Sequence, residues 1–232
     1  MEHLTRQADL IPSSALTKQI NIIGAGAVGS WLTLALAKMG FSNLTVFDDD
    51  DIEVENMNCQ CYSFNDIGKK KVTALKERVH ELTGTNINAV VSRYEGDRAM
   101  AGIVVSAVDS MASRRQAWEI HAKYGTQTNL FIDPRMGAEE ALCYAYQPMK
   151  PDHVKQYEAT LYSDDDAVHE PCTRKATMYT ALMLSGLVAQ IIKEFLTNKG
   201  NHLQVSNWSI KNGAFVGFTE EKVLSLSKER TQ

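Results

Sequence analysis

The chain has 232 residues, of which 44% are hydrophobic, and its 24 basic and 28 acidic side chains give a net charge of −4. This is enough for one domain with a full hydrophobic core, and the mildly acidic balance argues against nucleic acid or an anionic membrane as a partner. Polar residues directly after Met1 argue against a signal peptide. Four cysteines without any Cys-x-x-Cys pair favour a reducing, cytoplasmic setting over a zinc site or a disulfide framework.

The first half of the chain alternates short apolar runs with helical patterns. Residues 19–24 form an apolar run ending in glycine, which predicts a buried strand and a turn. The other predicted elements are a helix at 27–39, strands at 44–47 and 87–91, a helix at 68–83 with Val72, Leu75, Val79 and Leu82 at helical spacing, a strand at 103–108, a helix to about 123, and a strand at 130–132 ending at Asp133-Pro134. This alternation predicts an α/β fold, a doubly wound Rossmann-like sheet with helices on both faces.

The pattern changes after residue 140. We expect a strand at 140–147, a long polar crossing loop at 148–171 and a buried apolar helix at 173–197, rather than a membrane span. Asn212-Gly213 between two apolar runs predicts a hairpin. The added strands make the sheet mixed, within a single domain over 1–222 followed by a loosely ordered tail at 223–232.

A glycine-rich turn follows the first predicted strand. Gly24, Gly26 and Gly29 would let backbone N–H groups approach a phosphate at a helix N-terminus. Asp48, at the end of the second predicted strand, is placed to bind ribose hydroxyls. These features suit NAD, FAD, S-adenosylmethionine and ATP equally, so an NAD-dependent oxidoreductase stays an alternative at this point.

Three further motifs follow in order and distinguish among these nucleotides. They are Asp48-x-Asp50-x-Ile52-Glu53-x-x-Asn56-x-x-x-Gln60, then Gly68-x-x-Lys71, then Val108-Asp109-Ser110-x-x-x-Arg114. In this order they resemble the ubiquitin-activating-enzyme-like superfamily, which includes ThiF, MoeB and HesA. The resemblance covers about residues 5–197, includes Arg6-Gln7 and Arg135-Met136-Gly137, and is nearest to compact single-domain bacterial, plasmid or phage forms.

The resemblance implies ATP- and Mg²⁺-dependent adenylation of the C-terminal carboxylate of a small ubiquitin-like or sulfur-carrier protein. Its residue roles would be Asp48 on the ribose, Asn56 and Gln60 at the phosphates, Lys71 on the phosphates, Asp109 on magnesium, and Arg6 reaching into the partner's site of a homodimer; Asp50 and the three glycines complete the nucleotide-binding set. The chemistry agrees, because an ionised carboxylate attacking a triphosphate needs cations and no general base.

Each residue also has a purely structural alternative. Lys71 sits in a lysine run that could be solvated, Asp50 could cap a turn, Asn56 could bond its own turn, and Asp109 could cap a helix. The functional interpretation rests on their order as a set.

One position departs from the family pattern, because Cys59 stands where the family has an arginine. Loss of a phosphate-binding guanidinium can cost roughly 10²-fold in rate, and Arg93, Arg135, Lys69 or Lys70 would have to compensate. The alternative is a catalytically weakened binding module that docks a partner.

Cys172 is a candidate nucleophile for a later transfer step. It lies where the crossing loop meets the helix at 173–197, followed by Arg174 and Lys175, and such an environment lowers a thiol pKa. The alternative is a cysteine that only packs, as we expect for Cys143.

Overall fold

One eight-stranded sheet forms the centre of the computed structural model, which describes residues 2–97, 99–124, 127–137, 139–163, 176–197, 206–211 and 214–218. The strand order is β3-β2-β1-β4-β5-β6-β7-β8. The parallel part comprises β1 (Ile20–Ile23), β2 (Leu44–Phe47), β3 (Asn88–Val90), β4 (Gly102–Ser106) and β5 (Thr128–Met136). The antiparallel part comprises β6 (Ala141–Tyr146), β7 (Ser206–Lys211) and β8 (Ala214–Phe218). The predicted mixed sheet is confirmed, as is the pairing of the last two strands; Asn212-Gly213 lies outside the described residues.

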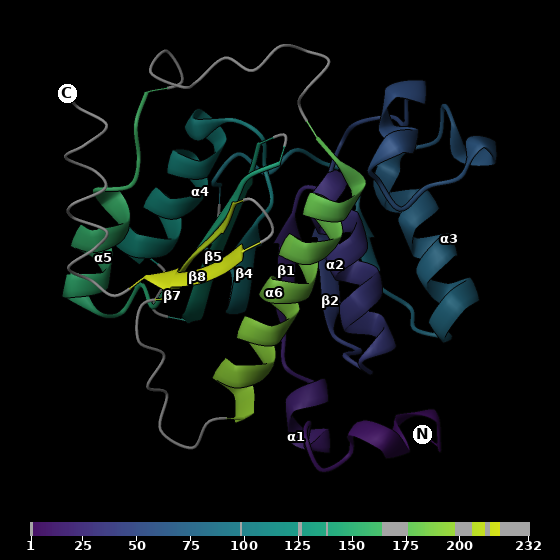
Figure 1. The fold of residues 1–232 in the computed structure, drawn as a ribbon, viewed down its shortest axis with the longest axis horizontal. Helices are drawn as coiled ribbons and strands as arrows, with labels where there is room; N and C mark the ends of the chain where they lie inside the picture. Colours follow the sequence, from purple (N-terminus) through teal and green to yellow (C-terminus); the bar gives the residue numbers. More distant parts are fainter. Residues whose placement is uncertain are drawn as a thin grey trace.

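Helices cover both faces of the sheet (Figure 1). Along β1 the side chains alternate, so that Ile22 joins one hydrophobic cluster and Ile23 joins the other. The first cluster is covered by α2 (Ala27–Lys38), α3 (Lys71–Thr83) and α6 (Met178–Thr197). The second is covered by α4 (Met111–Tyr124) and α5 (Pro151–Glu158), where the Trp118 and Tyr157 rings lie 4.3 Å apart. Burial of apolar side chains on both faces is the main stabilising term of such a sheet.

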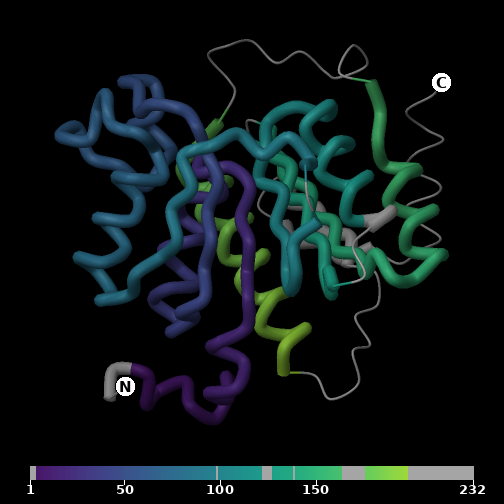
Figure 2. The backbone as a smooth tube through the Cα atoms, turned by 180° about the vertical axis from the view of Figure 1, so that it is seen from behind, coloured from purple at the N-terminus to yellow at the C-terminus, as the bar shows by residue number. Residues whose placement is uncertain are grey.

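Short helices complete the described chain at two places. Before β1 lie η1 (Glu2–Gln7) and α1 (Ser13–Leu16), and between β2 and α3 lie η2 (Val54–Asn58) and η3 (Phe64–Asp66). Figure 2 shows η1 and α1, in purple, beyond the end of the sheet at which β1 begins.

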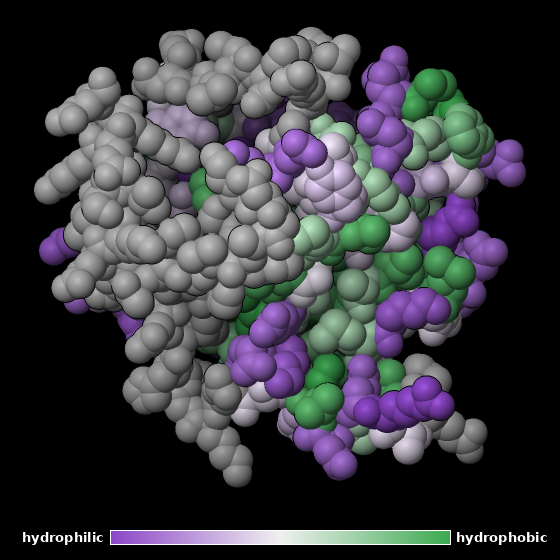
Figure 3. Space-filling model, in the orientation of Figure 1, coloured by the Kyte–Doolittle hydropathy of each residue, from purple (hydrophilic) through white to green (hydrophobic). Residues whose placement is uncertain are grey.

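Helix α6 is part of the core, as predicted. It is long and apolar enough to cross a membrane by length and composition, yet 56% of its most apolar 18-residue stretch is buried. The Ser185 hydroxyl donates a hydrogen bond of 3.0 Å to the Val28 carbonyl of α2. On its outer side Met178, Tyr179 and Leu182 remain exposed, and Figure 3 shows hydrophobic surface over the region where Figure 1 places α6 and α2.

Helix α3 begins three residues later than predicted. Residues 68–70 pair with the loop after β2 instead, because Ile52 N–H donates to the Lys69 carbonyl at 2.9 Å and Lys71 N–H donates to the Asp50 carbonyl at 3.0 Å. Gly68 has φ +83°, outside the helical region. At the other end, the prediction that Leu82 shares the buried face is wrong, since it is 43% exposed.

Two predictions for the segment after β4 are also wrong. The strand predicted at 130–132 continues through Pro134 to Met136. Its pairing with β4 ends at Ile132, and residues 133–136 pair only with β6. Proline is tolerated there because this part of the strand has a neighbour on one side only. The crossing loop begins with α5, which has Pro151 as its first residue and buries His153 and Tyr157, spaced i and i+4. Of the helix expected at 173–197, residues 173–175 lie outside the described part and α6 starts at Met178.

Candidate functional site

The glycine turn connects β1 to α2. It lies beside β4, at the place in the sheet where the strand order reverses direction. Ligands of doubly wound sheets bind at such a switch point. Gly24 has φ +96°, and a Cβ there would lie 2.5 Å from the Ala107 carbonyl oxygen. A Cβ on Gly29 would lie 1.9 Å from the Gly24 oxygen. Gly26, which caps α2, has no heavy atom within 4 Å of its Cβ position. Gly24 and Gly29 therefore allow the close approaches within the turn, and Gly26 leaves open space at the positive end of α2.

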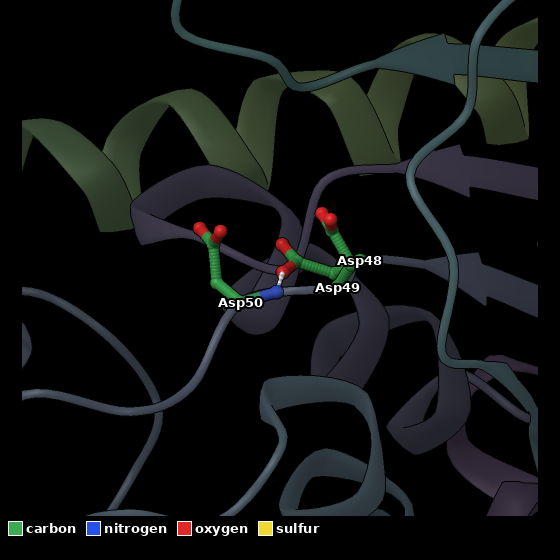
Figure 4. Close-up of side chains that lie close together, drawn as sticks. All are labelled: Asp48, Asp49 and Asp50. Carbon is green, nitrogen blue, oxygen red and sulfur yellow. Dashed lines mark hydrogen bonds between the residues drawn. The ribbon is translucent and has the colours of Figure 1, made fainter.

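Asp48 is anchored to this turn. Its carboxylate accepts hydrogen bonds from Ala25 N–H at 2.7 Å and from Asp50 N–H at 2.9 Å, the second of which is drawn in Figure 4. Burial raises the pKa of Asp48, while these backbone bonds and the nearby Lys71 charge act in the opposite direction. The carboxylate is thus fixed beside the turn, at the place where a ribose would lie in this fold.

Lys71 differs from the two lysines before it. Its residue is only 7% exposed, and its Nζ lies 2.6 Å from Asp50 Oδ2. The side chains of Lys69 and Lys70 are 43% and 42% exposed and pair with other carboxylates. Lys71 is therefore not a solvated surface lysine; it is a buried cation close to Asp48.

Residues 59–62 are tied to α2 and the glycine turn. Three hydrogen bonds do this: Trp31 Nε1 to the Cys59 carbonyl at 2.9 Å, Cys61 N–H to Ser30 Oγ at 3.1 Å, and the Tyr62 hydroxyl to the Ala25 carbonyl at 2.7 Å. They place Gln60 beside the start of α2. Its Oε1 atom is buried without a hydrogen-bond partner among the described residues. This oxygen is therefore available to accept a hydrogen bond from a water molecule or a ligand.

The thiol at position 59 does not replace the family's guanidinium. Cys59 is 5% exposed, and burial raises its pKa, so it carries no charge at neutral pH. Lys69 and Lys70 are engaged by Asp66, Glu77 and Asp51, and Arg93 is exposed on its loop.

The structural alternative applies in part to Asn56 and does not apply to Asp109. The Asn56 side-chain oxygen accepts the Glu53 N–H at 2.9 Å, so the structural alternative holds for its oxygen, and the amide nitrogen is the group left to donate. Asp109 is exposed after β4 and is not the helix cap, because the Ser110 hydroxyl accepts the Ser113 N–H at 3.1 Å.

The described residues contain one group of three metal-ligating side chains, and Asp109 is not in it. Asp48, Asp49 and Asp50 have carboxylate oxygens within 4.8 Å of one another (Figure 4). The structure thus does not join Asp109 to the acidic run. A magnesium ion needs only one or two protein carboxylates when a triphosphate supplies other ligands, so the residues present fit Mg²⁺ bound together with a nucleotide.

Arg6 lies far from this site within its own chain. Its neighbour Gln7 donates a hydrogen bond to the Met39 carbonyl, just past the C-terminal end of α2. The glycine turn is at the other end of that helix, about 18 Å away at 1.5 Å per residue. Arg6 is exposed, and within its own chain it is too far from the glycine turn to contact a ligand bound there.

A buried ionic cluster at the end of β5 was not predicted. Asp133 is 0% exposed and accepts hydrogen bonds from Arg114 Nε at 2.8 Å, Arg135 Nε at 2.7 Å and the Tyr157 hydroxyl at 2.9 Å. Burial opposes ionisation, but the two guanidinium groups hold the pKa of Asp133 below its usual value. Arg135 also donates to the Thr160 carbonyl at 2.8 Å. Arg135 is thus committed to joining α5 to the sheet, and does not replace the missing arginine.

Cys172 and residues 164–175 lie outside the described residues, so the nucleophile stays a prediction. The described cysteines are Cys59, Cys61 and Cys143, all buried as free thiols. Burial raises the pKa of Cys61 to about 11. Cys143 is 0% exposed, which confirms its expected place in the core.

A protein-family model described as the ThiF family matches residues 12–228. The chain belongs to the ThiF family. Among curated relatives it is 48% identical over 103 residues to the tRNA threonylcarbamoyladenosine dehydratase of Haemophilus influenzae, covering 41% of this chain and 40% of that protein. It is 31% identical over 108 residues to the sulfur carrier protein ThiS adenylyltransferase of Escherichia coli, covering 44% and 43%. The matched segments span less than half the length of either relative.

Solved structures with the same fold cover more of the chain. E. coli MccB with ATP aligns with a TM-score of 0.70 at 16% identity, over 91% of this chain and 67% of MccB. PaaA aligns with a TM-score of 0.69 at 19% identity, over 94% of this chain and 72% of PaaA. At these identities the likeness shows that this ThiF-family chain shares a Rossmann-like fold with them.

Proposed function

We propose that this ThiF-family chain binds ATP with Mg²⁺ and adenylates the C-terminal carboxylate of a small ubiquitin-like or sulfur-carrier protein that ends in glycine. The observation that supports this most strongly is the buried Lys71, placed near Asp48 and the glycine turn. A buried cation next to a ribose-binding acid and the positive end of a helix is suited to a triphosphate. It offers nothing for hydride transfer.

In the proposed reaction a carboxylate oxygen of the substrate protein attacks the α-phosphorus of ATP. The bond from the α-phosphorus to the oxygen bridging the β-phosphate breaks, and the products are an acyl-adenylate and pyrophosphate. Lys71 and the N–H groups at the start of α2 would stabilise the charge on the phosphates. The side-chain amide nitrogens of Gln60 and Asn56 would donate to phosphate oxygens, and Asp48 would hold the ribose.

Bound magnesium would supply additional positive charge to the leaving pyrophosphate. Asp109 is the residue we propose to hold it, together with phosphate oxygens. Its exposure after β4 leaves its carboxylate available to a ligand at the switch point.

We also place the protein in the cytoplasm, in keeping with its buried free thiols.

The direct test is ATP–pyrophosphate exchange in the presence of a small ubiquitin-like protein ending in Gly-Gly. We expect exchange with the free C-terminal carboxylate and none with the same protein carrying a C-terminal amide, because only the carboxylate can form the mixed anhydride. Exchange that is equal with both forms, or ATP binding with no exchange for any such protein, would contradict the proposal.

The second candidate substrate is the carboxylate of a threonylcarbamoyladenosine nucleoside in tRNA. It is favoured by the 48% identity over 103 residues to a tRNA threonylcarbamoyladenosine dehydratase. The net charge of −4 argues against it, since nucleic-acid affinity comes largely from basic side chains. A parallel exchange assay with tRNA carrying threonylcarbamoyladenosine distinguishes the two candidates.

The position of Arg6 supports a homodimer in which each chain completes the other's site. We expect that mixing inactive Arg6→Ala and inactive Lys71→Met chains restores about a quarter of wild-type exchange, because half the dimers are mixed and each mixed dimer has one intact site. If Arg6 acted within its own chain, the mixture would stay inactive. Subunit exchange in the mixture is verified with differently tagged chains.

A further inference from the structure

The ion pair between Lys71 and Asp50 is strongly asymmetric. The Lys71 side chain is 9% exposed, whereas the Asp50 side chain is 65% exposed, and Nζ and Oδ2 are 2.6 Å apart. A lysine ammonium with this little solvent contact is stabilised by an opposite charge within hydrogen-bonding distance. Asp50 supplies it, and its own exposure means that its carboxylate loses little if it turns back into water.

The backbone at this pair is held independently of the side chains. Lys71 N–H donates to the Asp50 carbonyl at 3.0 Å, and Asp51 and Lys70 form an antiparallel bridge. Asp50 N–H is bonded to the Asp48 carboxylate at 2.9 Å (Figure 4). Rotation of the Asp50 side chain would therefore release Lys71 without any movement of the loop or of α3.

We propose that Asp50 is an exchangeable counter-ion of Lys71. Its carboxylate occupies the position of a phosphate on Nζ while no nucleotide is bound, and the triphosphate displaces it on binding. The inference rests on the proposed function only in taking Lys71 as a phosphate ligand. Asp50 is then a residue that sets nucleotide affinity by competition, in contrast to Asp48, which is anchored to the glycine turn.

The neighbouring pair offers a matched control. Asp51 follows Asp50 and Lys70 precedes Lys71, and their charged groups lie 2.9 Å apart, with side chains that are 56% and 42% exposed. Asp51→Asn removes the same charge from the same loop but frees a lysine that is already solvated. Any general effect of the loop charge on a polyanion appears in both variants, and the difference between them reports direct competition at Lys71.

The experiment is titration calorimetry of ATP and of inorganic pyrophosphate, in EDTA, with the full chain. We expect Asp50→Asn to bind both ligands about fivefold more tightly than wild type, the scale of one partly exposed ion pair, and Asp51→Asn to stay within about twofold. In a Lys71→Gln background, Asp50→Asn should have no effect beyond that of Asp51→Asn, because the competed cation is gone.

Equal effects of Asp50→Asn and Asp51→Asn, or weaker binding by Asp50→Asn, would overturn the inference. The proposed function would survive that result if Lys71→Gln still weakened ATP binding. If wild-type protein bound neither ATP nor pyrophosphate in EDTA, the inference would fall, and if it also failed to bind ATP in the presence of Mg²⁺, the proposed function would fall with it. Asp50 is exposed, so its asparagine variant should still fold although Lys71 loses its partner, and a single cooperative thermal transition verifies this.

Discussion

Replacing Lys71 with methionine is expected to lower substrate-dependent ATP–pyrophosphate exchange by roughly 10²- to 10³-fold, the range seen when one preorganised charge-stabilising group is removed. We propose that Lys71, which is buried beside Asp48, contacts the phosphates, and Cys59 stands where the resemblance implies an arginine. Fewer positive groups then remain to stabilise the charge on the phosphates, so the loss of exchange activity should fall at the upper end of that range. Initial exchange rates at saturating ATP, together with the ATP dissociation constant, separate an effect on chemistry from one on binding.

Lys70→Met is the control for this prediction. Lys70 is the preceding residue, but its side chain is 42% exposed and pairs with Asp51, so we expect exchange within about twofold of wild type, since a surface pair contributes little. The Lys71 variant should fold, because methionine fits the aliphatic part of the buried position and the partner left behind, Asp50, is exposed. Full exchange by Lys71→Met would remove this residue from the site.

Asp133→Asn is expected to destabilise the protein by about 3–5 kcal/mol, the cost of leaving a buried charge without its partner. Asp133 is the shared acceptor of Arg114, Arg135 and Tyr157, and both guanidinium groups are almost fully buried. The amide would leave two positive charges facing each other inside the domain. Urea unfolding with a common m-value would measure the change.

The pH dependence provides an independent check. The folded-state pKa of Asp133 is lowered, so its contribution to stability is present above the unfolded carboxyl pKa of about 3.9 and is lost as the pH falls below it toward the folded value. Stability of the wild type should therefore decline more steeply in acid than that of Asp133→Asn. Asp51→Asn, which removes a surface carboxylate, should cost at most about 1 kcal/mol. A loss of similar size for both variants would contradict the importance of the buried cluster.

Much of the candidate site could be predicted from residue order alone. The glycine turn, Asp48 and Lys71 all come from motifs with fixed spacing, and each follows an apolar run that became a strand or precedes a segment that became a helix. The strands and the helix beside them were predictable because strand and helix periodicity is local, whereas the roles of these residues come from the resemblance to the family. The same local signals predicted the buried α6 and the antiparallel strands that extend the sheet.

Contacts between distant segments could not be read in this way. The motif singled out Lys71, but the sequence could not predict that Lys71 is buried while Lys69 and Lys70 are exposed, because their burial depends on how the loop after β2 pairs with residues 68–71. It offered no sign that Asp133 would collect two arginines and a tyrosine from α4, β5 and α5. The quoted motifs contain Arg114 and Arg135, but they do not indicate that both arginines pair with Asp133.

By itself, the sequence indicated the family through a resemblance of ordered motifs, and it predicted the order of most strands and helices, since these depend on local pattern and spacing. Only the tertiary structure decided which lysine is buried, that Arg6 lies far from the glycine turn of its own chain, and that Arg135 supports α5 instead of a phosphate. The physical reason is that burial and charge pairing arise when segments far apart in the chain pack together, and their free energies depend on distances that no local pattern contains.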